Sequence, residues 1–147
     1  MDIPKTLEDR LREGKVIPFV GAGVSMAVLD RQTDKRLFPG WRELLDRAAH
    51  RLEEETNGQH AAAVRALLNL PKPDYLEIAR HAREGLSEPT WYEFLKDQFD
   101  CPRDRAKTES LKLAQAIWNL KSQLVITTNY DDVLQWALPP HVYPESW

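Results

Sequence analysis

The sequence contains a glycine-rich run that is suited to binding a phosphate group. It follows the apolar residues 16–20 directly and consists of Gly21, Ala22, Gly23, Val24 and Ser25. A turn between a strand and a helix exposes unpaired backbone N–H groups and a positive helix end, where a phosphate or pyrophosphate can bind. One glycine permits a sharp turn, and the other removes the side chain where a ligand approaches the backbone. The Ser25 hydroxyl can cap the helix or donate to the ligand.

The glycine run by itself also fits an ordinary tight turn. The dinucleotide-binding fingerprint has a third glycine, and Met26 stands where that glycine would be. The position of the run directly after an apolar strand favours the phosphate-binding interpretation.

A second polar motif follows residues 123–128, which have the composition of a strand. It consists of Thr127, Thr128, Asn129, Tyr130, Asp131 and Asp132. These residues place hydroxyls, a carboxamide and carboxylates at the carboxyl end of a strand, where open α/β sheets bind ligands. The alternative is ordinary helix capping, because Asn129 or Asp131 precedes a stretch of helical character.

The spacing of apolar residues predicts the elements that position these two motifs. Strands are expected at 16–20 and 123–128, and helices at 6–14, 24–29, 41–55, 61–70, 75–85, 90–99, 108–119 and 131–137. The order predicts an α/β fold with a parallel sheet and a largely helical insertion between its first two strands. Two strands are few for a parallel sheet. We therefore expect further strands beyond Trp147, so that residues 1–147 are an incomplete domain; strands hidden within the insertion are the alternative.

Four tryptophans fall on the predicted helices, where burial in the core is the expected role. They are Trp41, Trp91, Trp118 and Trp136.

The composition is typical of a soluble globular protein. The 147 residues are 42% hydrophobic and 29% charged, with a formal net charge of -3. The mildly acidic balance gives no reason to expect direct binding to nucleic acid or to a membrane. A single cysteine, Cys101, and a charged start without a secretory signal favour a cytoplasmic location.

Taken in order, the motifs resemble those of the sirtuin family. Residues 21–25 are similar to its GAG-x-S loop, and residues 128–131 are similar to its Q-N-x-D loop, with Thr128 in place of the glutamine. Residues 38–45, Phe-Pro-Gly-Trp-Arg-Glu-Leu-Leu, resemble the P-x-W-x-x-L-L segment of the sirtuin-like branch common in bacterial defence systems. The resemblance covers about residues 16–137, and the helices between the motifs match only in character.

The resemblance implies a Rossmann-like fold and NAD as the ligand, consumed as a substrate. Residues 1–147 would form the N-terminal portion of one NAD-binding domain. Asn129 would face the nicotinamide ribose and either position the attacking water or stabilise the reacting sugar, and Asp131 would lie near the nicotinamide end. The residues implied to bind the cofactor, chiefly its diphosphate and the adjacent ribose, are Gly21, Ala22, Gly23, Ser25 and Thr128.

Two departures separate the chain from the protein deacylases of this family. Residues 26–31 replace their Gly-x-Pro-Asp-Phe-Arg loop, and Thr128 is typical of the NAD-hydrolase branch. The resemblance thus implies hydrolysis of NAD to nicotinamide and ADP-ribose as an anti-phage effector activity. In that branch a homo-oligomer or a partner defence protein triggers the enzyme.

Three alternatives to the hydrolase remain. They are a non-catalytic NAD-sensing or nucleotide-sensing and assembly module, an NAD-dependent protein deacylase, and an unrelated dehydrogenase. The last is weak because Asp46, at the distance of its ribose-binding acid, falls on a predicted helix.

The general base that the family uses lies in a His-Gly pair downstream of the asparagine loop. The sequence contains no such pair. His141 follows the loop without a glycine, and a surface histidine is its favoured interpretation. His50, His60 and His81 fall on predicted helices and are interpreted as surface or packing residues.

Overall fold

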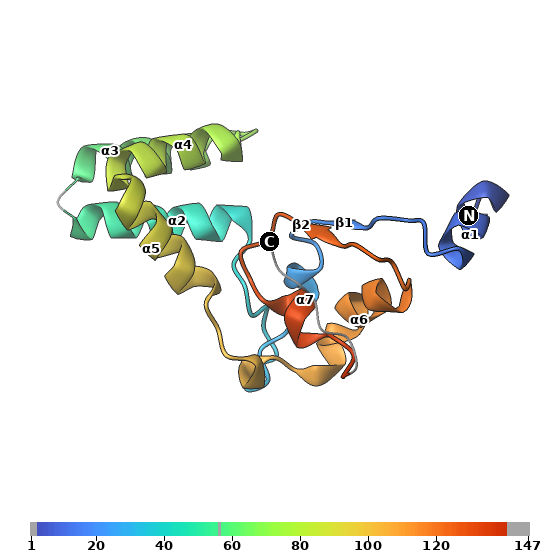
Figure 1. Cartoon of the computed structure of the whole chain (residues 1–147). Helices are drawn as coiled ribbons and strands as arrows, with labels where there is room; N and C mark the ends of the chain where they lie inside the picture. Colours follow the sequence, from blue (N-terminus) through green and yellow to red (C-terminus); the bar gives the residue numbers. More distant parts are fainter. Residues whose placement is uncertain (1–2, 56, 141–147) are drawn as a thin grey trace. The chain divides into compact units, whose positions relative to one another are not determined.

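The computed structural model describes residues 3–55 and 57–140 (Figure 1). These residues form a helix-rich mixed α/β structure with a small sheet of two parallel strands. The chain divides into two compact units. We call Met1–Leu37 with Cys101–Trp147 the sheet unit, and Phe38–Asp100 the helical unit.

The sheet unit contains strands β1 (Phe19–Val20) and β2 (Ile126–Thr127), which lie side by side (Figure 1). Phe19 is opposite Ile126 and Val20 is opposite Thr127 in a parallel register. The Ile126 amide donates to the Pro18 carbonyl at 3.0 Å. Pro18 is tolerated beside β1 because the sheet uses its carbonyl and does not need the N–H that proline lacks. The expected parallel pairing is confirmed.

Short helices complete the described part of the sheet unit. They are α1 (Lys5–Arg12), η1 (Ser25–Ala27), η2 (Arg103–Arg105), η3 (Thr108–Leu111), α6 (Lys112–Asn119) and α7 (Val133–Trp136). The Trp118 indole donates to the Leu134 carbonyl at 2.8 Å and ties α6 to α7. The buried apolar residues of this unit include Val20, Val28, Leu111, Ala114, Val133 and Trp136.

The helix expected over residues 24–29 is wrong. The chain forms only the three-residue 3₁₀ turn η1, and Val28 is already extended with a ψ of 129°. Leu29 and Asp30 then form isolated antiparallel bridges with Arg36 and Ala106. The Asp30 carboxylate accepts hydrogen bonds from the nearby Gln32 and Thr33 amides and from the distant Arg105 guanidinium, and together these bonds turn the chain.

Two expectations about burial also require correction. Both residues of β2 are exposed, and Phe19 of β1 is 70% exposed, although parallel strands are normally buried on both faces. Trp41 is exposed at the start of its helix, whereas Trp91 and Trp136 are buried as expected.

The described part of the helical unit, 38–55 and 57–100, contains four α-helices and no strand, so the alternative of hidden strands fails there. The helices are α2 (Trp41–Glu54), α3 (Gly58–Leu68), α4 (Tyr75–Leu86) and α5 (Glu88–Phe99). Helix α2 packs against α3 and α4, and α5 packs against α4 (Figure 1). Their fully buried side chains include Leu45, Leu52, Val64 and Ile78.

One ion pair holds the loop after η1 in the sheet unit. The Asp30 side chain is 7% exposed, and its Oδ2 accepts from Arg105 Nη2 at 2.7 Å and from Arg105 Nε at 3.2 Å. The Arg31 amide donates to the Arg105 carbonyl at 2.7 Å. The hydrogen bond from Arg105 and those from the Thr33 and Gln32 amides lower the pKa of Asp30 from 3.8 to about 2.

Asp30→Asn should therefore destabilise the sheet unit in a pH-dependent way. Because the folded-state pKa lies below the unfolded value, the carboxylate contributes stability above about pH 4 and loses it as the pH falls toward about 2. Thermal unfolding should give the variant a lower Tm than the parent at neutral pH, with the gap closing between those two pH values. Asp34→Asn, which removes an exposed partner of Lys107, is the control and should change Tm less. A gap independent of pH would contradict the assigned ion pair.

Gly85→Ala should destabilise the helical unit. A Cβ at this position of α4 would lie 2.7 Å from Leu52 Cδ2 and 2.8 Å from His60 Cβ. We expect urea denaturation to show a loss of about 1–3 kcal/mol in the free energy of unfolding. In the control, Gly58→Ala, a Cβ would meet nothing within 4 Å. That change should leave stability unchanged or raise it by up to about 1 kcal/mol, and equal effects of the two substitutions would contradict the packing.

Candidate functional site

The parallel sheet brings the two sequence motifs to the same edge. The carboxyl ends of parallel strands lie together, so the turn after β1 faces the loop after β2. Asn129 Nδ2 donates to the Gly21 carbonyl at 3.1 Å and to Ser25 Oγ at 2.8 Å. These bonds join residues that are 108 and 104 positions apart in the sequence.

Hydrogen bonds hold both the backbone and the side chain of Asn129 in place. Its own backbone N–H donates to Thr127 Oγ1 at 3.0 Å, which fixes the loop immediately after β2. Its partner Ser25 is only 3% exposed, so the acceptor oxygen is fixed within the unit. The carboxamide is thus positioned by hydrogen bonds to the backbone and to a buried hydroxyl, as a preorganised polar group requires.

The space into which a side chain at Gly21 or Gly23 would project is open. Gly21 and Gly23 do not have positive φ angles, and a Cβ added at either would meet nothing within 4 Å. Neither the backbone conformation nor internal packing therefore requires glycine at these positions. Gly40 and Gly58 are equally open, so openness alone does not mark a site. The turn differs from them because Asn129 reaches it.

The turn also offers backbone donors. The Val24 amide donates to the Gly21 carbonyl at 3.3 Å, and the Met26 amide donates to the Ala22 carbonyl at 2.9 Å. Among the described residues, the exposed Ala22 and Gly23 amides donate to no backbone carbonyl. Two adjacent N–H groups of this kind can bind an anion.

The remaining predicted residues of the second motif have different environments. Asp131 Oδ1 accepts a hydrogen bond from the Val133 amide at 3.1 Å, so this carboxylate caps the start of α7. Thr128 is exposed, and its amide donates to the Val20 carbonyl at 3.4 Å. The structure thus joins Asn129 to Gly21 and Ser25 by hydrogen bonds, whereas Asp131 bonds within its own loop.

Sequence reasoning did not assign a role to Thr127, whose hydroxyl orients Asn129. A signal was present, because a threonine two residues before an asparagine at the end of a strand can accept from that asparagine's amide. The Asp30 and Arg105 pair was missed as well, because 75 residues separate its members and no local pattern links them.

The described histidines do not lie in the sheet unit. His50, His60 and His81 belong to α2, α3 and α4 of the helical unit. His141 lies outside the described residues. The described part of the sheet unit therefore contains no imidazole group.

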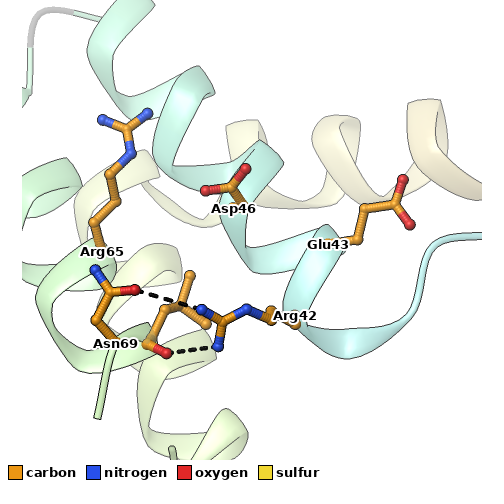
Figure 2. A pocket seen from close by; sticks show the side chains of 6 residues that line it. Arg42, Glu43, Asp46, Arg65 and Asn69 are labelled. Atoms are coloured by element: carbon orange, nitrogen blue, oxygen red, sulfur yellow. Dashed lines mark hydrogen bonds between the residues drawn. The ribbon is translucent and has the colours of Figure 1, made fainter.

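A hollow of about 440 Å³ lies within the helical unit (Figure 2). It is lined by Arg42, Glu43, Asp46, Arg65, Leu68 and Asn69. Figure 2 shows Arg42 and Asn69 pointing toward one another, and Arg42 Nη1 donates to the Leu68 carbonyl at 2.7 Å. Arg65 is paired with Glu53 outside the hollow. Because the lining carries both signs of charge and its arginines have internal partners, it does not have the features of an anion site.

The described residues support neither a metal site nor a membrane-spanning helix. No group of three or more histidine, cysteine, aspartate or glutamate side chains there could hold a metal ion. None of the helices in the same residues has the length and apolar character needed to cross a membrane.

Comparisons with protein-family models, with curated proteins and with solved structures find no match for this chain.

Asn129→Ala should lower the stability of the sheet unit. The substitution removes the bonds to Gly21 and Ser25 and leaves a buried hydroxyl with one partner fewer. We expect a loss of about 1–2 kcal/mol in the free energy of unfolding, measured by urea denaturation. Asn119→Ala makes the same chemical change at an exposed residue of α6 and should cost less. Identical unfolding curves for the two variants would mean that the Asn129 bonds contribute nothing in solution.

Proposed function

We propose that the sheet unit is part of a Rossmann-like, sirtuin-like domain and that the edge formed by the glycine turn and Asn129 binds NAD. The proposed reaction is hydrolysis of NAD to nicotinamide and ADP-ribose. The observation that carries the proposal is the pair of hydrogen bonds from Asn129 to Gly21 and Ser25. They join at one sheet edge two of the three motifs on which the sirtuin resemblance rests.

The glycine turn has the features that a dinucleotide diphosphate requires. Ala22 and Gly23 are exposed residues whose amides donate to no described backbone carbonyl, so these amides can donate to phosphate oxygens. The space beside Gly21 and Gly23 is free of protein atoms within 4 Å of an added Cβ, so a ligand can approach the backbone closely. The three-residue η1 adds little dipole, because a helix dipole needs several aligned peptide groups. The backbone amides would therefore supply most of the attraction.

Asn129 supplies the polar group at the reacting end in this proposal. Its Nδ2 is held by the turn, which leaves the carboxamide oxygen to accept a hydrogen bond from a ribose hydroxyl or from a water molecule. Loss of nicotinamide leaves positive charge on the ribose, and oriented carboxamide and carboxylate oxygens stabilise such charge. Asp131 is two residues away and would contribute the carboxylate. Water adds to the ribose carbon as the bond to nicotinamide breaks, nicotinamide leaves as a neutral molecule with the bonding electrons, and the water loses one proton to solvent, which gives ADP-ribose.

A second candidate is a non-catalytic module that binds NAD or another nucleotide and senses it. The observation that favours this candidate is the use of Asp131 as the cap of α7. A carboxylate engaged in capping explains its presence in the loop without catalysis. Both candidates share the binding step and differ only in the release of nicotinamide. The role in anti-phage defence, with an oligomer or a partner protein as trigger, rests on the sequence resemblance alone.

Gly23→Ala tests the binding step without disturbing the fold. The added methyl meets no protein atom within 4 Å, so stability should be unchanged or raised by up to about 1 kcal/mol. The same methyl would enter the space that the diphosphate needs, and isothermal titration calorimetry should show NAD affinity reduced by at least about tenfold. Gly58→Ala, equally open but in the helical unit, should bind NAD as the parent does. If the Gly23 variant binds NAD with parental affinity, the turn is not the diphosphate site.

Nicotinamide release, followed by chromatography, separates the two candidates. The chain and any longer natural form that contains it would be incubated with NAD, with Asn129→Ala and Asn119→Ala as test and control. Release that is lost in the Asn129 variant and kept in the Asn119 variant would support hydrolysis. Binding without release, in every form and with a candidate trigger present, would favour the sensing module.

A further inference from the structure

The chain segment that follows the glycine turn is fixed to a distant part of the sheet unit. The Leu29 amide donates to Ser110 Oγ at 3.0 Å, across 81 positions of sequence. The Lys107 amide donates to the Leu29 carbonyl at 2.8 Å, and the Arg31 amide donates to the Arg105 carbonyl at 2.7 Å. The chain after η1 is thus bound to the region of η2 and η3, and its position does not depend on neighbouring residues alone.

The glycine turn is connected to this segment by consecutive backbone hydrogen bonds. The Met26 amide donates to the Ala22 carbonyl at 2.9 Å, and the Val28 amide donates to the Ser25 carbonyl at 3.0 Å. Val28 is fully buried, so the chain leaves η1 through a packed position with little room to rearrange. A displacement of the segment after Val28 would therefore also displace η1 and the turn.

Arg105 is the residue on which this segment depends most. The two oxygens of the nearly buried Asp30 carboxylate have different partners. Oδ1 accepts from the Gln32 and Thr33 amides, and among the described residues Oδ2 accepts only from the Arg105 guanidinium. Without Arg105, Oδ2 would be a poorly hydrated charged oxygen with no partner, which is strongly unfavourable. The segment could hydrate it only by moving toward solvent.

We propose that Arg105 is a positioning residue of the candidate site. Acting through Asp30, it holds the glycine turn in the conformation in which the Ala22 and Gly23 amides can bind a ligand. Asn129 holds the same turn from the loop after β2, so the turn has two supports from distant parts of the sequence. The inference rests on the proposed function only for the identity of the ligand, because Arg105 stays in its ion pair and acts on the turn.

Native-state hydrogen exchange, followed residue by residue by NMR, tests the support of the turn. Arg105→Ala should accelerate exchange of the Met26 and Val28 amides by at least about tenfold, because local opening of the segment breaks their bonds. The amide of the buried Trp136 in α7, in the same unit, should keep its parental rate. Arg105→Lys keeps the positive charge and should give a smaller acceleration at the same two amides. This variant carries the test if Arg105→Ala does not fold.

Lys107→Ala is the matched control for these exchange rates. It also removes an ion pair to this segment, but its partner Asp34 is exposed, so no buried charge loses its partner. Its Met26 and Val28 amides should exchange as in the parent. Unchanged rates at both amides in the Arg105 variants would overturn the proposal. Equal acceleration at Trp136 would also overturn it, because Arg105 would then support the whole unit and not the turn.

Isothermal titration calorimetry with NAD tests the consequence for binding. Arg105→Ala should reduce NAD affinity by at least about tenfold, Arg105→Lys should reduce it less, and Lys107→Ala should bind as the parent does. Parental affinity in Arg105→Ala would overturn the positioning role. Gly23→Ala should instead lose affinity without faster exchange at Met26. If the parent chain does not bind NAD, the proposed function fails, and the exchange rates still decide whether Arg105 holds the turn.

Discussion

The parallel pairing of β1 with β2 is the constraint that the candidate site depends on. Two parallel strands end at the same edge, so the polar residues that follow each strand must meet there. The pairing also requires a long connection, because the chain must return to the opposite edge before the second strand begins. Here the connection includes all four helices of the helical unit. The bonds from Asn129 to Gly21 and Ser25 follow from this arrangement, since no local interaction could bring those residues together.

Elements whose signals are local could be predicted from the sequence. Helices α2, α4 and α5 follow the apolar spacing of their own residues, and Asp74 caps α4 by accepting from the Leu76 and Glu77 amides. The two strands were found from short apolar runs, and their parallel order follows from the helical stretch between them. The proximity of the two motifs was predictable to the same degree, because topology alone places both at one edge.

Features that depend on distant partners were not predictable in the same way. Residues 24–29 have helical spacing, but the Asp30 side chain binds the next amides and the Arg105 guanidinium, and the chain turns instead. The exposure of Phe19 was not predicted because an apolar residue in a strand implies that another segment covers it, and the sequence does not say which segment does so. Trp41 illustrates the same point, since a large apolar residue at the first turn of a helix can lie outside the core.

At some positions the fold requires glycine, whereas at others the presence of glycine needs another explanation. Gly14 has a φ of 65°, and Gly85 packs against Leu52 and His60, so structure alone accounts for both. Gly21 and Gly23 meet neither condition. Glycine also costs conformational entropy on folding, so two of them in a short turn are unfavourable unless something gains from the missing side chains. A ligand that approaches the backbone beside Asn129 would benefit from the missing side chains. We therefore propose the glycine turn, and not the hollow in the helical unit, as the ligand-binding site of this protein.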